Sequence, residues 1–186
     1  RISNDMIALI DLWNELLQNL KVQRLPGFPI WSDRLCDLDA NEDLSQYPCW
    51  KRNIIMRNNE LYINNRNYID NWLMKAKKNP LFFGAKAKLE WQAGQTEKPN
   101  IWEQIFQLRP SGIRVKTNSY FPALVAIVQT SIIGSRKRYL TPRECARLQC
   151  FPESFVPDKK KVQAYRQFGN AVNVKCAKLL IEHMIG

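Results

Sequence analysis

A short, sharply bounded helix that begins after Thr141 is the feature that most constrains this chain of 186 residues. Thr141 can cap free backbone N–H groups, and Pro142 suits the first helical position because its φ is preset. Glu144 can reach back to the N–H of Thr141. The helix must end before Pro152, because the residue preceding a proline is pushed out of the α region. Local chemistry alone therefore predicts a short surface helix that carries Arg143.

The rest of the sequence is suited to a folded protein that does not cross a membrane. Hydrophobic residues make up 45% of the chain and include six tryptophans, a composition that argues against disorder. No run approaches the roughly 18 apolar residues that a membrane span requires, and no basic-then-apolar leader opens the chain. Because the first residue is Arg1 and not Met, we expect a fragment, a processed product or a trimmed form.

The charge distribution favours a polyanionic partner. The chain has 28 Lys and Arg residues against 17 Asp and Glu residues, a net charge of +11. Nine of the basic residues and only three of the acidic ones lie between positions 136 and 166. This clustering is typical of nucleic-acid binding, although a well-solvated basic surface would have the same composition.

The cysteines indicate a reduced, intracellular protein. The chain has five, at positions 36, 49, 145, 150 and 176, and no Cys-x-x-Cys pair occurs among them. The number is odd, and the single histidine offers little for a metal site. We therefore expect neither a disulfide framework nor structural zinc.

Hydrophobic spacing predicts helices in the first part of the chain and strands in its middle. We expect an amphipathic helix over 2–20 and one long helix or two shorter ones over 50–78. The segment 25–31 holds two prolines and a glycine and is expected to be irregular. The acidic segment 32–49 is expected to be a solvent-facing loop. Other expected elements are a short helix or strand over 101–108 and a helix over 172–185.

Two β-type runs are expected, over 113–116 and over 123–131. In the first run apolar and basic side chains alternate. The alternation places Arg114 and Lys116 on one face of a strand, an arrangement that suits a sheet edge facing phosphate.

Two strings near the C-terminus carry a family resemblance. Residues 140–152 read Leu-Thr-Pro-Arg-Glu-Cys-Ala-Arg-Leu-Gln-Cys-Phe-Pro. This string resembles the ninth conserved block of the DNA cytosine-5 methyltransferases, which is approximately Leu-Thr-Pro-Arg-Glu-Ala-Ala-Arg-Leu-Gln-Gly-Phe-Pro. Residues 165–172 read Tyr-Arg-Gln-Phe-Gly-Asn-Ala-Val and resemble the tenth block, Gln-(Phe/Ile)-Gly-Asn-(Ala/Ser)-Val. Residues 90–126 also resemble the target recognition region of one branch of these enzymes. Cys150 departs from the usual Gly, and it would carry a small strain cost if the family Gly is a left-handed C-cap.

The resemblance implies a mixed α+β fold with two parts. Residues 1–138 would form an irregular target recognition domain with short strands and helices, and residues 139–186 would contribute helices that complete a Rossmann-like methyltransferase domain. The implied cofactor is S-adenosylmethionine, with Asn170, Ala171 and Val172 closing over its pocket. The last helix would pack on the cofactor-binding sheet. Asn170 alternatively serves only as the cap of that helix.

The implied partner is double-stranded DNA, read in the major groove by residues 110–131 and their basic flanks. The side chains expected to contact DNA are those of Arg109, Arg114, Lys116, Arg136, Arg138 and Arg143. Arg143 and Arg147 would tie the recognition region to the catalytic domain or to phosphate. An equally open alternative is that these two arginines form structural ion pairs with Glu144 and Glu153.

The chemistry of cytosine methylation is incomplete in this chain. The reaction needs a thiolate that adds to C6, a carboxylate that assists at N3 and a Gly-rich loop for S-adenosylmethionine. No Phe-x-Gly-x-Gly and no Glu-Asn-Val string occurs, and the Gln-x-Arg at 107–109 lacks its second arginine because residue 111 is serine. Cys49 lies in a Pro-Cys-Trp string and not in Pro-Cys-Gln, so we expect it to be structural.

These observations lead to two hypotheses. In the first, the chain is the DNA-recognition half of a cytosine-5 methyltransferase of a restriction-modification system, acting in the cytoplasm at the nucleoid. It would be inactive alone and completed by an N-terminal catalytic half or subunit. In the alternative, it is a non-catalytic DNA-binding or regulatory module derived from such an enzyme. An isolated half should expose the apolar face meant for its partner and should self-associate.

Overall fold

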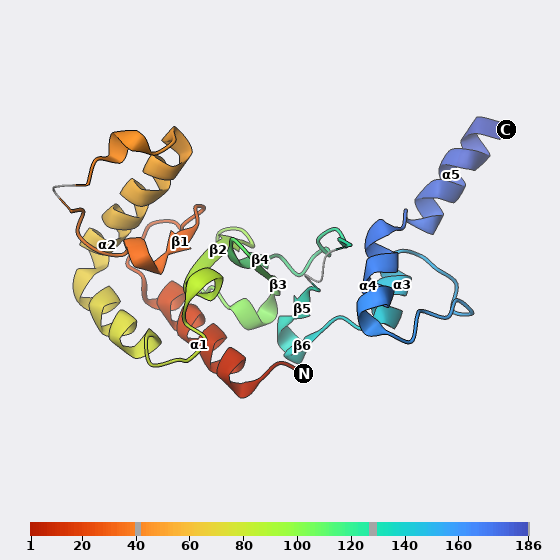
Figure 1. The fold of residues 1–186 in the computed structure, drawn as a ribbon, viewed down its shortest axis with the longest axis horizontal. Coiled ribbons are helices and arrows are strands. Elements are labelled where there is room, and N and C mark those ends of the chain that lie inside the picture. Colours follow the sequence, from red (N-terminus) through yellow and green to blue (C-terminus); the bar gives the residue numbers. More distant parts are fainter. Residues whose placement is uncertain (40–41, 127–129, 186) are drawn as a thin grey trace.

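The computed structural model describes residues 1–39, 42–126 and 130–185, and it places helices at both ends of an elongated molecule with a sheet between them (Figure 1). The helices are α1 (Asn4–Asn19), α2 (Cys49–Ala76), α3 (Pro142–Leu148), α4 (Lys161–Asn170) and α5 (Val174–Ile185). The strands are β1 (Ile30–Trp31), β2 (Lys88–Gln92), β3 (Ile105–Arg109), β4 (Gly112–Lys116), β5 (Ile132–Ile133) and β6 (Arg138–Tyr139). Short turns of tighter helix include η4 (Ile101–Glu103) and η5 (Gly134–Arg136). The predicted mixed α+β class is confirmed.

The six strands form one mixed sheet in the order β1-β2-β4-β3-β5-β6. Strands β2 and β4 are parallel, and the other neighbouring strands are antiparallel. A two-residue turn, Pro110-Ser111, joins β3 to β4, with Arg109 paired to Gly112 across it. The strand predicted over 113–116 is therefore confirmed as part of β4. The sheet also includes β1, β2, β5 and β6, which were not expected from the sequence.

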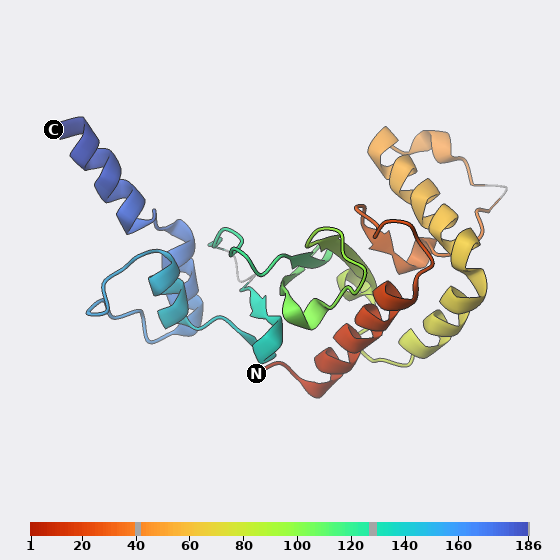
Figure 2. The ribbon, with the colours of Figure 1, turned by 180° about the vertical axis from the view of Figure 1, so that it is seen from behind.

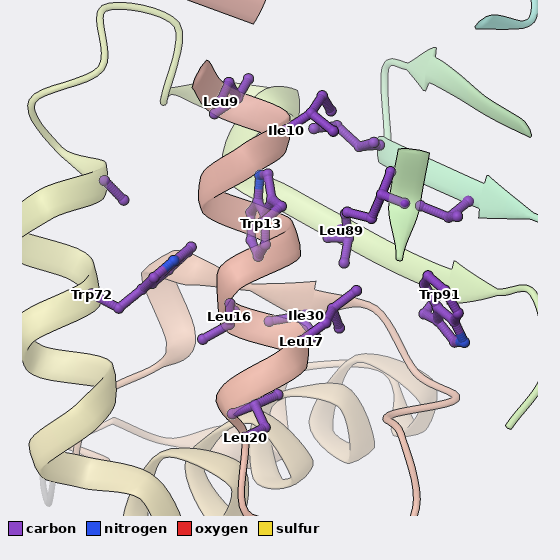
Figure 3. Close-up of a cluster of buried hydrophobic side chains, with 14 of the residues drawn as sticks. Leu9, Ile10, Trp13, Leu16, Leu17, Leu20, Ile30, Trp72, Leu89 and Trp91 are labelled. Carbon is purple, nitrogen blue, oxygen red and sulfur yellow. The ribbon is translucent and has the colours of Figure 1, made fainter. Parts of the chain in front are cut away.

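The main core lies between α1, α2 and one face of the sheet (Figure 3). The apolar stripe of α1 is fully buried along its middle, and it points at Leu89 and Trp91 of β2 on one side and at α2 on the other. Trp13 packs on Trp72 with ring centroids 5.0 Å apart. Both indole N–H groups donate to backbone carbonyls, so neither buried ring leaves a polar atom unsatisfied.

Helix α2 spans the predicted region 50–78 and is kinked within it. Asn65 has a non-helical φ of −132°, and its side-chain oxygen accepts a hydrogen bond from the N–H of Lys21 at 2.7 Å. Closer to the start of the same helix, the side-chain oxygen of Asn58 accepts a hydrogen bond from the N–H of Trp31 at 2.9 Å. These buried asparagines tie the loop after α1 and strand β1 to the helix. The interpretation as two helices is confirmed, because two helical segments of α2 meet at a kink at Asn65.

A second, smaller hydrophobic cluster is built around α3 and α4. Its buried members are Leu140, Cys145, Ala146, Ala164 and Phe168. Phe151 and Phe155 pack against Phe168, with the first two ring centroids 4.6 Å apart. The partly buried side chains of Phe121, Leu124 and Ile133 also contact this cluster. The domain division between residues 138 and 139 stays a prediction.

Helix α5 extends away from this cluster, as both views of the ribbon show (Figures 1 and 2). None of its described residues is buried. Its large aliphatic side chains are open to solvent, with Leu180 at 64% and Met184 at 83% exposure. Among the described helices, none combines the length and the apolar character needed to cross a membrane.

The strand predicted over 123–131 is wrong for the residues that the structure describes. Residues 122–126 and 130–131 form no strand, and residues 127–129 lie outside the described part. The backbone at 125–126 instead lies against Gly169 of α4. The sheet resumes only at β5, which pairs with β3 through Ile132 and Ile133. The segment 25–31, predicted to be irregular, ends in the two-residue strand β1.

Candidate functional site

The polar face of the central strands collects three of the residues predicted to bind DNA. Leu89, Trp91 and Val115 point into the core, so the residues that alternate with them point to the opposite side of the sheet. The register sets Glu90 beside Arg114, and Arg114 beside Gln107. We call this surface the polar sheet face. Its members are Lys88, Glu90 and Gln92 of β2, Gln107 and Arg109 of β3, and Arg114 and Lys116 of β4.

Arg114 is held by its strand neighbour. Its Nε donates to Oε2 of Glu90 at 2.7 Å, and the two side chains are 26% and 18% exposed. The second carboxylate oxygen of Glu90 accepts a hydrogen bond from the amide of Gln92. The carboxylate is therefore bonded on both oxygens, and the arginine is fixed across the β2–β4 pair.

Arg109 is held in a similar way on the neighbouring strand. Its Nε donates to Oε1 of Gln107 at 3.1 Å. Gln107 is buried, and its amide donates to the hydroxyl of Ser131 at 3.1 Å. Burial lowers the pKa of Arg109, and the positive charge of Arg114 lowers it further. An arginine stays protonated in spite of such a shift, so the face carries two neighbouring guanidinium cations.

Lys116 and Arg136 lie beyond these two arginines. Lys116 ends β4 opposite Ile105, on the same face and half-buried. Arg136 belongs to η5 and is exposed. It borders a cavity of about 600 Å³ between the sheet and α3, where Arg147 lies on the other rim. The predicted DNA contacts over 109–136 are thus brought to one side of the sheet and its edge.

The start of α3 has the predicted capping box. The hydroxyl of Thr141 accepts from the N–H of Glu144 at 3.2 Å, and the carboxylate of Glu144 accepts from the N–H of Thr141 at 2.8 Å. Arg138 adds a two-pronged ion pair to the same carboxylate, at 2.8 and 2.7 Å. The pKa of Glu144 is lowered to about 2. The main cause is the hydrogen bonding from Arg138, and the hydrogen bonds from Thr141 lower the pKa further. Arg138 is therefore engaged by α3.

Arg143 and Arg147 both turn toward the segment after α3. Arg147 forms an ion pair with the carboxylate of Glu153 at 2.7 Å, and Arg143 donates to the backbone oxygen of Glu153 at 3.2 Å. The structural alternative is therefore right for Arg147 and Glu153. It is wrong for Glu144, whose partner is Arg138. The Arg147 pair is more than 60% exposed on both sides, so its contribution to stability is small.

The two strings that resemble conserved blocks are joined at one point. The amide of Gln149 donates to the backbone oxygens of Phe168 and Ala171, at 3.0 and 3.3 Å. In return, the N–H of Val174 donates to the backbone oxygen of Gln149 at 2.9 Å. The end of α3 thus anchors the turn from α4 to α5. Cys150, which follows, has the left-handed φ of +58° that was expected from the family glycine.

Gly169 allows α4 to approach the middle of the chain. A Cβ atom at this position would lie 2.2 Å from the backbone nitrogen of Ala126 and from the backbone carbon of Val125. Real side chains do not occupy such a space, so only glycine fits without movement of the backbone. The glycine of the second string therefore has a packing reason.

The three predicted cofactor residues lie at the turn between α4 and α5. Asn170 ends α4, and Asn173 caps α5 by accepting hydrogen bonds from the N–H groups of the second and third helical residues. The alternative role of Asn170 as the cap is therefore wrong. Asn170 and Val172 are exposed, and Ala171 is half-buried. Their role beside a cofactor pocket stays a prediction.

Two further cysteines, Cys145 and Cys49, bear on catalysis. Cys145 is buried in the second cluster, and this burial raises the pKa of its thiol to about 11. A protonated, enclosed thiol is a poor nucleophile. Cys49 is exposed and opens α2, at the opposite end of the molecule from α3, α4 and α5 (Figure 1).

Comparison with known proteins agrees with the two strings and the middle region. The family model described as C-5 cytosine-specific DNA methylase matches residues 23–186. The chain belongs to this family of DNA methylases. The match covers the segment that carries the polar sheet face, both conserved strings and the helices around them.

The relatives of this chain include several type II methyltransferases. It is 41% identical to M.AluI of Cellulosimicrobium cellulans over 231 residues, which cover 99% of this chain and 44% of that protein. It is 36% identical to M.BanI of Aneurinibacillus aneurinilyticus over 86 residues, 46% of this chain and 19% of that protein. It is 56% identical to M.DsaV of Dactylococcopsis salina over 48 residues, 26% and 14% of the two chains. The chain therefore spans less than half the length of these relatives. No solved structure matches it.

Two residues that shape the candidate site were not predicted from the sequence. Glu90 and Gln107 hold the predicted arginines, and neither was among the expected contacts. The available signal was the alternation of Leu89 and Trp91 with polar residues, which is typical of a half-buried strand.

Proposed function

We propose that this chain is the DNA-recognition half of a cytosine-5 DNA methyltransferase. It binds duplex DNA through the polar sheet face and the basic residues around η5, and it depends on a catalytic half for methyl transfer. The observation that carries this proposal is a combination. The family match extends over residues 23–186, while the sequence holds no Pro-Cys-Gln, Phe-x-Gly-x-Gly or Glu-Asn-Val string. A member of the family without a nucleophile string needs one from elsewhere.

Helix α5 supports the need for a second component. It carries large aliphatic side chains that are 55–83% exposed at Leu179, Leu180, Ile181, Met184 and Ile185. An apolar surface of this kind is costly in water and marks a contact site. We propose that it packs on the catalytic half, beside the edge formed by residues 170–172. That half would supply most of the S-adenosylmethionine site, and this chain would contribute one wall to it.

The charge and geometry support DNA as the substrate. The net charge is +11, and the polar sheet face and η5 present arginine and lysine side chains on one side of the molecule. Arg138 and Arg143, which are bonded within the C-terminal part, would position α3 and not contact DNA directly. Together with this function we propose an intracellular location, where the chain would meet DNA.

The decisive experiment measures transfer of labelled methyl groups from S-adenosylmethionine to duplex DNA. The purified chain is assayed alone and then together with the product of the reading frame immediately upstream. Silence alone and activity in combination support the proposal. Activity of the chain alone contradicts it and points to Cys49 as the nucleophile. Silence in both assays favours the alternative, a non-catalytic DNA-binding or regulatory module.

DNA binding itself is tested by its salt dependence. Neutralisation of about five phosphates gives a slope of log K against log salt concentration of roughly −4 to −5. A flat response excludes DNA binding under both the recognition-half and the regulatory-module hypotheses.

A further inference from the structure

The two arginines of the polar sheet face are only partly used by their partners. Arg109 and Arg114 each donate through Nε. Neither of the terminal Nη atoms of these residues has a hydrogen-bond partner within residues 1–39, 42–126 and 130–185. A guanidinium has five N–H donors in a fixed plane. Each side chain is thus held through its Nε, and its four Nη–H groups have no partner among the residues that the structure describes.

The two arginines stand on neighbouring strands and on the same face of the sheet. Across the β3–β4 pair, Gln107 stands opposite Arg114, and Arg109 stands opposite Gly112. The two arginines are therefore diagonal neighbours on one face. Gly112 has no side chain to fill the space beside Arg109. A Cβ atom at Gly112 would lie 3.0 Å from the Cβ and the backbone oxygen of Lys88. A larger residue therefore does not fit at position 112 without movement of its neighbours.

The charge balance favours a base edge over a phosphate. A phosphate contact acts through net positive charge and releases counterions. The charge of Arg114 is already offset by Glu90 at 2.7 Å, in a pair that is about three-quarters covered. What the pair retains is the geometry of the fork. Guanine offers two neutral acceptors, O6 and N7, in the major groove, and they match one arginine fork.

We propose that Arg109 and Arg114 are a base-reading pair that contacts guanine in the major groove, with Gln107 and Glu90 as the positioning residues that hold them. The inference rests on the proposed function, because it requires that the chain binds duplex DNA. Beyond the proposed function, it identifies the residues that read the DNA sequence and the base edge that they contact.

The test begins with a selection of binding sites. The full chain is equilibrated with a pool of 30-base-pair duplexes that contain eight randomised positions, and the bound fraction is sequenced. We expect enrichment of guanine at one or two fixed positions. The selected duplex is then made with 7-deazaguanine, which lacks the N7 acceptor, at each enriched guanine. This replacement should weaken binding by the wild-type chain about tenfold at the position that a fork reads.

Substitution then separates base reading from charge. Arg114→Lys keeps the positive charge and removes the fork, so binding to the selected duplex should fall about tenfold while the salt slope stays the same. The 7-deazaguanine duplex should cause no further loss in this variant. Glu90→Gln removes a negative charge, so binding to the unselected pool should rise or stay constant, whereas binding to the selected duplex should fall.

Glu42→Gln is the matched control. Glu42 pairs with Arg34 at 2.8 Å, and these side chains are 23% and 20% exposed, close to the exposure of the Glu90 pair. It lies outside the sheet, so this variant should retain the selected sequence and its affinity. Its behaviour separates loss of any half-buried ion pair from loss of the positioned fork.

Three results overturn the inference. The first is binding without sequence enrichment. The second is a Glu90→Gln chain that binds both selected and unselected duplexes more tightly, which would make Arg114 a phosphate contact. The third is an equal effect of 7-deazaguanine in the wild-type and Arg114→Lys chains. These outcomes leave DNA binding intact, so they differ from a flat salt response, which would remove the proposed function as well.

Discussion

Replacement of Glu144 by glutamine tests the junction between β6 and α3. The carboxylate accepts two hydrogen bonds from Arg138, at 2.8 and 2.7 Å, and two from the N–H and hydroxyl of Thr141, at 2.8 and 3.0 Å. Glutamine has nearly the same shape but one acceptor oxygen and no charge. The variant therefore loses the ion pair and part of the capping box.

The magnitude follows from the pKa of Glu144, which is lowered from 4.5 to about 2. One pKa unit corresponds to 1.36 kcal/mol, so the shift sets an upper limit of roughly 3 kcal/mol. The side chains of Arg138 and Glu144 are 24% and 27% exposed, and solvent screens part of the interaction. We therefore expect Glu144→Gln to reduce the opening free energy of α3 by about 1–2 kcal/mol at pH 7.

The effect should depend on pH in a defined direction. The folded-state pKa of Glu144 lies below its unfolded-state value, so the carboxylate stabilises the folded state above about pH 4.5 and loses this effect as the pH falls toward 2. Glutamine does not titrate. The difference between wild type and variant should therefore shrink on acidification, to roughly 40% of its neutral value at pH 3.

Hydrogen exchange of peptides that cover residues 139–150, corrected for the intrinsic rate at each pH, measures this opening. Tryptophan fluorescence would not, because all six tryptophans lie at or before Trp102. Glu153→Gln is the control, since the Arg147–Glu153 pair is exposed and its loss should barely change exchange. The reasoning is refuted if the two variants lose equal protection, or if the deficit of Glu144→Gln is as large at pH 3 as at pH 7.

Three further predictions concern the C-terminal part. Gly169→Ala should destabilise the protein by about 1–3 kcal/mol in thermal or urea unfolding, because its Cβ would overlap the backbone on which α4 packs; Gly27→Ala, whose Cβ meets nothing within 4 Å, should change little. Cys150→Gly should slow hydrogen exchange of α3 by relieving a left-handed residue, a gain of up to about 1 kcal/mol, and unchanged exchange would show that no strain is stored there. A chain with Leu180→Asp and Ile181→Asp should sediment as a monomer at concentrations where the wild type associates through α5; equal association of the two would mean that another surface is responsible.

The sequence pattern of a capping box predicted the start of α3 but not the ion-pair partner of Glu144. Thr141 and Glu144 are three residues apart, so the capping box needs only a helical backbone. The choice of Arg138 over Arg143 as the partner of Glu144 depends on the direction in which β6 enters the helix. That direction is set by pairing of β6 with β5, which no local pattern encodes.

The prediction of strands failed where tertiary contacts competed with propensity. The apolar run over 123–131 has the composition of a strand, yet its described backbone lies against Gly169 instead of in the sheet. In contrast, β2 was not predicted although Leu89 and Trp91 show the alternation of a half-buried strand. Parallel pairing with β4 brings together residues 24 positions apart, and single-strand patterns do not specify such a neighbour.

The same parallel pairing explains why the arginines could be proposed from sequence while their positioning residues could not. Alternation alone places Arg114 on the polar side of β4. Only the register places Glu90 beside it, and a slip of one residue would turn Glu90 toward α1 and the core. Burial of Leu89 and Trp91 against α1 opposes that slip, because it would expose both apolar side chains (Figure 3). The apolar contacts of the core therefore determine which acid stands beside Arg114, and through it the direction of the guanidinium fork.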